Sequence, residues 1–346
     1  MNNISLTIGS YTDYPSESQG LYQVNLNTTT GILSKLELLS SCQNPSFVVS
    51  SQSGYYVISE VAQNAHPRLS FINNKSSSSP TNSAPIVGDH PCHIAIDPNN
   101  KYIVTSQYSS GSFDIFALNI DGTIDQRMAT ISPKGSGPHA DRQTRPHAHQ
   151  CVFLKSTPQY ATVDLGSDRV NFYCFDEEQN QFLSEPAQSI MTPPGSGPRH
   201  IVFSQDETAA YVVCELSETI LVLRKTLGQW GITQEIDALP KEKKGEAAAA
   251  IKLSPDGRFL YVSCRAQSKI SCFEVSKENQ QLTFKDSFST QGKFPRDFYI
   301  SDDGEWVVAA NQHSNSLVSF KRNNKNGALT YTGSLVTIGS PVCVTN

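Results

Sequence analysis

The sequence predicts an all-β protein, a seven-bladed β-propeller with four antiparallel strands in each blade, formed by residues 1–346 as a single domain. Three observations support this fold. A unit of roughly 50 residues recurs along the chain, which is typical of propeller blades. The composition, with 21 glycines and 19 prolines among 346 residues, favours short strands joined by turns. The two ends of the chain each resemble one part of the same unit.

Each copy of the unit begins with a short apolar run that a polar turn joins to a second apolar run. In the clearest copy, Ile201–Phe203 precedes the turn Ser204–Thr208, and Ala209–Cys214 follows it. Third runs such as Ile220–Leu223 and more polar fourth runs such as Ala328–Tyr331 complete four strands. The copies start at residues 45, 91, 148, 198, 248, 295 and 341.

The last copy is incomplete, and the beginning of the chain supplies what it lacks. Pro341–Asn346 looks like a first strand with no second strand after it, whereas Ile4–Tyr11 looks like a second strand with no first strand before it. Pairing these two segments closes the ring and removes two exposed sheet edges. A solenoid is the alternative arrangement, but its two ends need not complement each other.

Four irregular segments lie between the predicted strands. We expect a polar loop at Asn73–Pro85, a long loop at Ser132–Pro146, a compact turn at Pro193–Pro198 and an exposed charged loop at Lys241–Gly245. No segment shows a strong helical pattern.

Composition and charge exclude several classes of protein. The net charge is −5 and only 17% of the residues are charged, so we expect neither nucleic acid nor a membrane as partner. The first residues lack the pattern of a signal peptide, and no run approaches the roughly 18 apolar residues of a membrane span. The eight cysteines are scattered without a Cys-x-x-Cys pair, which predicts reduced thiols in a cytoplasmic protein. We expect a monomer or weak homodimer that needs no cofactor.

Two sets of equivalent positions should face the central channel, because the innermost strand of each blade surrounds the axis. The first set follows the opening Pro or Ala of each copy: Ser46, Cys92, His149, Arg199, Ala249, Arg296 and Val342. The second set follows the second apolar run: Tyr11, Glu60, Tyr108, Asp164, Glu215, Arg265 and Gln312. The members of each set differ in type and most are polar. They indicate either a water-filled channel with internal salt bridges or a functional site.

The functional interpretation is favoured by adjacency along the chain. Three consecutive copies contribute the following residues: His147, His149, Arg199, Glu215 and Arg265. A metal site is the competing interpretation of the His147-Ala-His149 pair, with His139 or His200 as a further ligand. Because Arg199 and Arg265 would compete with a cation, we predict no metal. A Gly-x-Ser-x-Gly motif is absent from the sequence, which argues against a serine hydrolase. We expect His66 and His313 on the surface.

Several segments also match a known family. They are Arg145–Gln150, Val163–Val170, Gly195–His200, Tyr211–Leu216, Ser254–Val262 and Ala310–Gln312. The chain resembles, over essentially its whole length, the seven-bladed lactonase family. Members of that family include bacterial propeller-type 6-phosphogluconolactonases, and fungal muconate lactonizing enzymes are related to it. The Pro-His-Ala-His-Gln and Gly-Pro-Arg-His motifs are the most specific part of this resemblance.

The resemblance implies a cytosolic enzyme that hydrolyses a sugar-phosphate lactone, 6-phosphogluconolactone, in the oxidative pentose phosphate pathway. The site proposed for the family maps onto His147 or His149, Arg199, Glu215 and Arg265. The chain departs from the family pattern at three places. Cys214 and Cys264 stand where the family often has Asn, and Ala248–Ala250 replaces a proline-containing motif.

Hydrolysis of a lactone passes through a tetrahedral oxyanion, so the site needs a base for the attacking water and a donor for the oxyanion. We hypothesise that Glu215 or His149 is the base, and that Arg199 or Arg265 binds the oxyanion. The remaining arginine and Arg296 would bind the phosphate. Further substrate contacts are expected from Asp164, Gln312, Glu60 and Tyr108. The alternatives are a non-catalytic binding scaffold and an enzyme acting on another lactone, such as a muconolactone.

Overall fold

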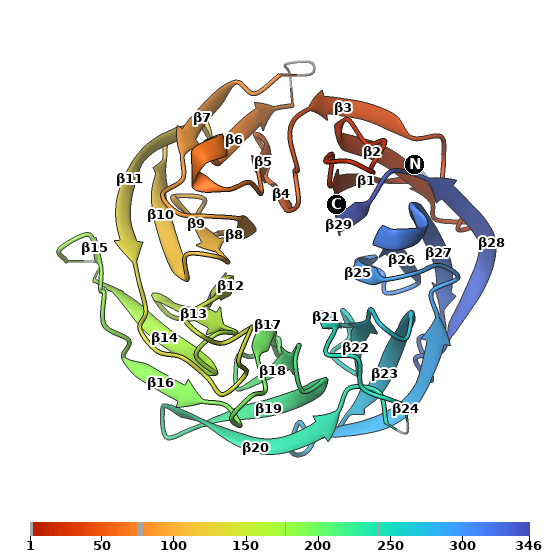
Figure 1. Ribbon diagram of the computed structural model, residues 1–346. Coiled ribbons are helices and arrows are strands. Elements are labelled where there is room, and N and C mark those ends of the chain that lie inside the picture. The colour runs from red at the N-terminus through yellow and green to blue at the C-terminus, as the bar shows by residue number, and fades with distance from the viewer. Residues whose placement is uncertain (1–2, 75–78, 177, 241) are drawn as a thin grey trace.

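Seven antiparallel sheets are arranged around a central axis in the computed structural model (Figure 1). The structure describes residues 3–74, 79–176, 178–240 and 242–346. Each sheet is one blade, and each blade places its strands from the axis outward in the order of the repeat. The predicted all-β, seven-bladed propeller is therefore confirmed. Within the described residues, no helix is long and apolar enough to cross a membrane.

The strands of the blades are as follows. Blade 1 contains β29 (Pro341–Thr345), β1 (Asn3–Ser10), β2 (Gly20–Asn27) and β3 (Glu37–Ser41). Blade 2 contains β4 (Val48–Ser50), β5 (Gly54–Ile58), β6 (Arg68–Asn73) and β7 (Asn82–Pro85). Blade 3 contains β8 (Pro91–Ile96), β9 (Tyr102–Gln107), β10 (Ser112–Leu118) and β11 (Ile124–Ile131). Blade 4 contains β12 (Ala148–Phe153), β13 (Gln159–Asp164), β14 (Arg169–Asp176), β15 (Gln181–Phe182) and β16 (Gln188–Met191).

The last three blades have four strands each. Blade 5 contains β17 (Pro198–Phe203), β18 (Ala209–Cys214), β19 (Thr219–Thr226) and β20 (Gln229–Asp237). Blade 6 contains β21 (Ala248–Leu253), β22 (Phe259–Cys264), β23 (Lys269–Val275) and β24 (Leu282–Ser289). Blade 7 contains β25 (Pro295–Ile300), β26 (Trp306–Asn311), β27 (Ser316–Arg322) and β28 (Leu329–Thr337).

The two ends of the chain meet in blade 1, as the sequence predicts. Strand β29 pairs antiparallel with β1, and Ile8 lies opposite Val344. The labelled ends lie close together in Figure 1, where red and blue strands share one blade. The last segment of the chain thus supplies the innermost strand that the first segment lacks, and the ring has no open sheet edge at this seam.

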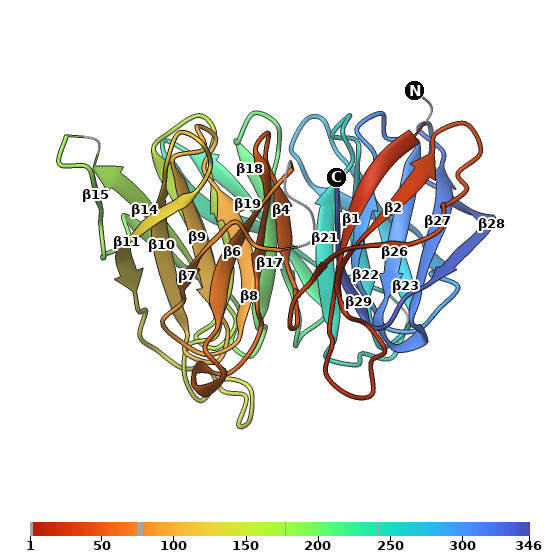
Figure 2. The same cartoon turned by 90° about the horizontal axis from the view of Figure 1, so that it is seen from above.

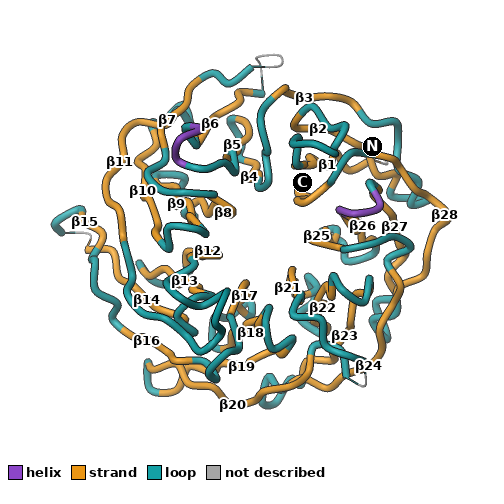
Figure 3. The backbone as a smooth tube through the Cα atoms, in the orientation of Figure 1, coloured by secondary structure: helices purple, strands orange, loops and turns teal. Residues whose placement is uncertain are grey.

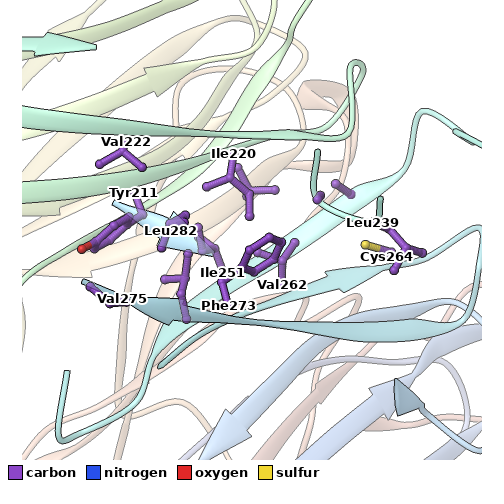
Figure 4. Packing of buried hydrophobic residues seen from close by; sticks show 14 of the residues in the cluster. Tyr211, Ile220, Val222, Leu239, Ile251, Val262, Cys264, Phe273, Val275 and Leu282 are labelled. Atoms are coloured by element: carbon purple, nitrogen blue, oxygen red, sulfur yellow. The ribbon is translucent and has the colours of Figure 1, made fainter. Parts of the chain in front are cut away.

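The core consists of layers between neighbouring blades. In the layer between blades 5 and 6, Tyr211 and Ile220 pack with Val262 and Phe273 (Figure 4). The other clusters of buried hydrophobic residues likewise each join two adjacent blades. A side chain in a middle strand is therefore covered by the next blade, which explains why these strands are apolar on both faces.

The turn after the innermost strand is specified by a repeated Ser-x-Asp pattern. Ser204 Oγ donates to Asp206 and accepts a hydrogen bond from Ala209 N at 3.0 Å. Ser254 and Ser301 make the equivalent bonds in blades 6 and 7. Because strand direction alternates, these turns lie at one face of the ring (Figure 2). The turns between second and third strands lie at the opposite face, together with the segments that link the blades.

Some local expectations need correction. Asn73–Pro85 was expected to be a loop, but Asn82–Pro85 forms β7, which pairs with β6; residues 75–78 of this segment lie outside the described residues. In the part of the chain that the structure describes, two single helical turns occur, η1 (Gln63–Ala65) and η2 (Gln312–Ser314) (Figure 3). Of the charged loop predicted at Lys241–Gly245, residues 242–245 are exposed as expected, and residue 241 is outside the described residues. His66 and His313 are exposed, as predicted.

Candidate functional site

A β-bulge in the innermost strand sets the first ring of side chains. In blade 4, Ala148 lies opposite Asp164 and Gln150 lies opposite Val163, so His149 has no partner on β13. The same shift leaves Arg199 unopposed in blade 5, Cys92 in blade 3 and Arg296 in blade 7. A bulge redirects one side chain out of the regular alternation. In these four blades, the side chain of the residue after the opening Pro or Ala therefore does not follow the regular alternation of the strand.

One repeated backbone hydrogen bond defines the second ring. The N–H that follows the second strand donates to the carbonyl of the residue just ahead of the innermost segment. Glu215 N donates to Gly197 O at 2.7 Å, and Arg265 N donates to Ala247 O at 3.1 Å. Equivalent bonds place the following residues at the same level: Tyr11, Glu60, Tyr108, Leu165, Glu215, Arg265 and Gln312.

This pattern corrects the position predicted for Asp164. The equivalent residue in blade 4 is Leu165, and Asp164 is still part of β13. A shift of one residue along a strand reverses the face of a side chain. The Asp164 carboxylate is fully buried and accepts hydrogen bonds from His147 N at 2.7 Å and Gly166 N at 3.0 Å. It stabilises the turn after β13 and does not line the central cavity.

Glu215 is the centre of an ion-pair cluster. Arg199 Nε and Arg265 Nη2 each lie 2.9 Å from its Oε2 atom, and Arg142 Nη2 lies 2.7 Å from its Oε1 atom. Burial by itself would raise the pKa of this carboxyl, but Arg265 and Arg199 lower the pKa well below its usual range. Glu215 is therefore charged, and both of its oxygens are occupied. These properties suit a residue that positions arginines better than a residue that removes a proton from water.

Arg142 is the site residue that the sequence did not indicate. It lies in the long connection between β11 and β12, which follows no repeat. Its side chain also donates to the Tyr108 hydroxyl, with Nη2 at 2.9 Å. The neighbouring Gln143 is fully buried and donates to Asp168 Oδ1 at 2.7 Å, which ties this loop to the ring. The only signal in the sequence was the length of the loop, Ser132–Pro146.

The two histidines of the Pro-His-Ala-His motif have different positions. His149 is buried in the cavity wall, with Nδ1 3.8 Å from Cys92 Sγ. Burial and then the charge of Arg199 lower the pKa of His149 well below 6.5, so this imidazole is neutral at neutral pH. His147 instead stacks on Tyr108 with a centroid distance of 4.5 Å. Its Nδ1 atom is 2.9 Å from Tyr108 O and must donate, since a carbonyl only accepts.

Arg296 is positioned differently from the arginines around Glu215. Its guanidinium lies 5.4 Å from the centre of the Tyr11 ring. Among the described residues it makes no ion pair within 4 Å and no hydrogen bond. The Tyr11 hydroxyl donates to Glu60 Oε1 at 3.0 Å. Arg296 is thus a cation whose hydrogen-bonding groups are available to a ligand.

These residues surround a cavity of about 530 Å³, within the size range of small-molecule sites. It brings together most of the predicted residues: Glu60, Tyr108, His149, Glu215, Arg265 and Arg296. Arg199 is only 3% exposed and supports Glu215 without lining the cavity. Gln312 lines a neighbouring hollow that shares Tyr11 and Glu60 with this cavity. The described residues contain no group of three His, Cys, Asp or Glu side chains arranged to hold a metal ion.

The profile of the family described as "Lactonase, 7-bladed beta-propeller" matches residues 5–346. The chain belongs to the seven-bladed β-propeller lactonase family. It is similar to the 6-phosphogluconolactonase of Bacillus subtilis (strain 168), with 33% identity covering 97% of this chain and 96% of the relative. Membership in this family makes the protein a lactone-hydrolysing enzyme, which is a carboxylic ester hydrolase. A non-catalytic scaffold, which the sequence left open, is thereby set aside.

Two solved structures in the family resemble the whole chain. A putative 6-phosphogluconolactonase from Bacteroides uniformis has a TM-score of 0.91 at 28% identity and covers 100% of this chain, which covers 99% of that protein. The periplasmic gluconolactonase PpgL of Pseudomonas aeruginosa has a TM-score of 0.90 at 28% identity, with 99% and 98% coverage. The similarity therefore extends to proteins named for phosphorylated and for unphosphorylated sugar lactones.

Proposed function

We propose that the protein hydrolyses 6-phosphogluconolactone to 6-phosphogluconate, as a step of the oxidative pentose phosphate pathway. The observation that carries this proposal is an arginine in the cavity wall that has no ion-pair partner, Arg296. Arg142, Arg265 and Arg296 line the cavity together with Glu60, Glu215 and Glu246. Arg142 and Arg265 are paired with Glu215, whereas Arg296 makes no ion pair within 4 Å among the described residues. Arginine presents a planar set of donors that suits phosphate oxygens. A relative at 33% identity is named for this reaction, which supports the same choice of substrate.

In the proposed mechanism, the neutral imidazole of His149 takes a proton from water as the water attacks the lactone carbonyl. Arg265 or Arg142 stabilises the oxyanion that forms. Glu215 holds these two arginines and Arg199 in place, and its strongly lowered pKa argues against a role as the base. Arg296 binds the phosphate. Collapse of the tetrahedral intermediate breaks the bond between the carbonyl carbon and the ring oxygen. The protonated His149 returns its proton to that oxygen, so the product is the open hydroxy acid and His149 is neutral again.

The first experiment measures acid release from freshly prepared 6-phosphogluconolactone above the spontaneous rate, with gluconolactone and muconolactone as comparison substrates. His149→Gln should reduce kcat by at least about a hundredfold, because a general base typically contributes about 10²–10⁴-fold. The matched control is His66→Gln, which changes an exposed histidine outside the cavity and should retain wild-type turnover.

Two results would refute parts of this proposal. Faster turnover of muconolactone than of both sugar lactones would refute the substrate. Full activity of His149→Gln would refute the assignment of the base. Two expectations from the sequence stay predictions: a cytoplasmic location, and a monomer or weak homodimer as the oligomeric state.

A further inference from the structure

Tyr108 is held in the wall of the reaction cavity by the first histidine of the Pro-His-Ala-His motif. Its ring stacks on the His147 imidazole, with an interplanar angle of 21° and a centroid distance of 4.5 Å. His147 Nδ1 also donates to the Tyr108 carbonyl at 2.9 Å, so both the ring and the backbone of Tyr108 are supported. Tyr108 lines the cavity together with Arg142 and His149. The motif thus supplies a support for a tyrosine of the cavity wall as well as the proposed base.

The Tyr108 hydroxyl accepts hydrogen bonds from one edge of the Arg142 guanidinium. Arg142 Nε lies 3.2 Å and Arg142 Nη2 lies 2.9 Å from the phenolic oxygen. A phenol has one O–H donor, and its oxygen can accept from other donors. Because both contacts bring N–H groups to the oxygen, the hydroxyl hydrogen must point away from Arg142. Among the described residues, the hydroxyl makes no hydrogen bond in which it is the donor.

This arrangement makes the hydroxyl a strong donor. A hydroxyl that accepts from a cation is polarised, and hydrogen bonds in a chain strengthen one another. Glu215 Oε1 lies 2.7 Å from the same Arg142 Nη2 atom and holds the cation in place. Burial is the largest influence on the Tyr108 phenol and raises its pKa. Tyr108 therefore keeps its proton at neutral pH and can offer it in a hydrogen bond.

This donor and the proposed base are neighbours in the cavity. The Tyr108 and His149 rings meet edge to face, with their centroids 5.5 Å apart. A water held by His149 and a carbonyl held by Tyr108 would therefore lie close enough to react. Arg265, by contrast, already uses Nε on Ala247 O and Nη2 on Glu215. The Tyr108 hydroxyl is thus a donor of the cavity wall that no protein acceptor occupies.

We propose that the Tyr108 hydroxyl donates a hydrogen bond to the oxyanion of the tetrahedral intermediate, and that Arg142 polarises the hydroxyl for this purpose. This inference rests on the proposed function, because it takes His149 as the base. The carbonyl oxygen gains negative charge as water attacks, so the hydrogen bond strengthens in the transition state. The hydroxyl keeps its hydrogen throughout, and the charge on the oxyanion disappears when the intermediate collapses.

The first test removes the hydroxyl. Tyr108→Phe keeps the ring against His147 and should lower kcat about 10²- to 10³-fold, the usual effect of one oxyanion donor. KM should change by less than about threefold, because the hydrogen bond strengthens only in the transition state. The matched control is Tyr102→Phe, at the opposite face. Tyr102 is also partly buried, and its hydroxyl donates to Asn180 Oδ1 at 2.7 Å. This control should keep wild-type turnover.

The second test separates a donor to the oxyanion from a mere anchor for Arg142. Fluorine on the ring of a tyrosine makes the O–H a better donor and the oxygen a poorer acceptor. A donor to the oxyanion therefore predicts that Tyr108→fluorotyrosine raises kcat about two- to fivefold, and that difluorotyrosine raises kcat further. An anchor for Arg142 predicts the opposite sign, because the weaker acceptor holds the guanidinium less firmly.

The proposal is overturned if Tyr108→Phe keeps more than about a tenth of wild-type kcat, or if fluorination lowers kcat or leaves it unchanged. The fluorinated variants keep the phenol and are decisive if Tyr108→Phe does not fold. Failure of the proposed function has a different signature, because wild-type protein then hydrolyses neither sugar lactone above the spontaneous rate. In that case the Tyr108 variants are measured on the lactone that wild-type protein does hydrolyse, since every lactone has the same carbonyl group.

Discussion

Glu218 offers a test of whether catalysis depends on a contact between two blades. This residue is 2% exposed and lies in the turn between β18 and β19. Its carboxylate accepts hydrogen bonds from Gly245 N and Ala247 N, both at 3.0 Å. Ala247 O in turn accepts from Arg265 N at 3.1 Å and from Arg265 Nε at 3.0 Å. Glu218 thus positions the carbonyl that orients an arginine of the Glu215 cluster.

Glu207 is a natural control for the same chemistry. Its carboxylate accepts from Lys155 N at 2.6 Å and from Ser156 N at 2.9 Å, and so also joins two blades. It lies in the turn between β17 and β18, at the face opposite the cavity. Replacing either glutamate by glutamine exchanges one carboxylate oxygen for an NH2 group. This NH2 group faces a backbone N–H and cannot accept its hydrogen bond. An unsatisfied buried group costs about 1–3 kcal/mol, so both variants should lose a similar free energy of unfolding.

Only Glu218→Gln should lose activity. A displacement of about 1 Å at a catalytic group can cost on the order of a hundredfold in rate, so we expect kcat to fall about 10- to 100-fold for this variant. Glu207→Gln should stay within about twofold of wild type. The measurements are urea unfolding and lactonase turnover at saturating substrate, on both variants. Equal loss of activity in the two variants, or none in either, would refute the positioning role of Glu218.

Three further predictions follow from the cavity, the channel and the seam of the ring. Arg296→Met should raise KM for 6-phosphogluconolactone at least about tenfold and leave gluconolactone nearly unchanged, which steady-state kinetics on both substrates will show. Burial lowers the pKa of His93 to about 3. Below pH 6.5 the unfolded chain therefore binds a proton at this residue that the folded chain does not bind. The free energy of unfolding should fall by roughly 1.4 kcal/mol per pH unit as the pH decreases from 6.5. Urea unfolding at pH 7.5 and pH 5 gives the loss in free energy of unfolding between the two pH values, and His93→Gln should make this loss smaller. An unchanged loss in the variant would show that other groups cause the destabilisation by acid. Deleting residues 341–346 removes β29 and exposes the edge of β1, so the truncated chain should melt at lower temperature and aggregate, as light scattering would detect.

Much of the fold could be predicted because its signals are local. The inner strands are short apolar runs, and in blades 5, 6 and 7 the turn after the innermost strand carries a Ser-x-Asp sequence, as at Ser204 and Asp206. Repetition of these local signals set the number of blades, and the incomplete copies at the two ends set the closure. The split outer strand of blade 4 had no such signal, because β15 and β16 are only two and four residues long.

The candidate site was predictable only where it follows the repeat. Glu215 and Arg265 occupy equivalent positions in consecutive blades, so alignment of the copies placed them at one level. The same alignment placed Asp164 one residue too early, because sequence spacing does not resolve the last residue of a strand from the first residue after it. The hydrogen bond from Leu165 N to His147 O makes that distinction.

The sequence by itself determined a ring of seven similar sheets with different polar residues at equivalent positions near the axis. Periodic patterns of apolar residues and turns encode these features locally, so they can be read without coordinates. The tertiary structure decided which charged side chains form ion pairs. Arg142 reaches Glu215 from a loop that follows no repeat, and the same side chain donates to the Tyr108 hydroxyl. Such contacts join residues far apart in the chain, and only the closed ring brings them within hydrogen-bonding distance.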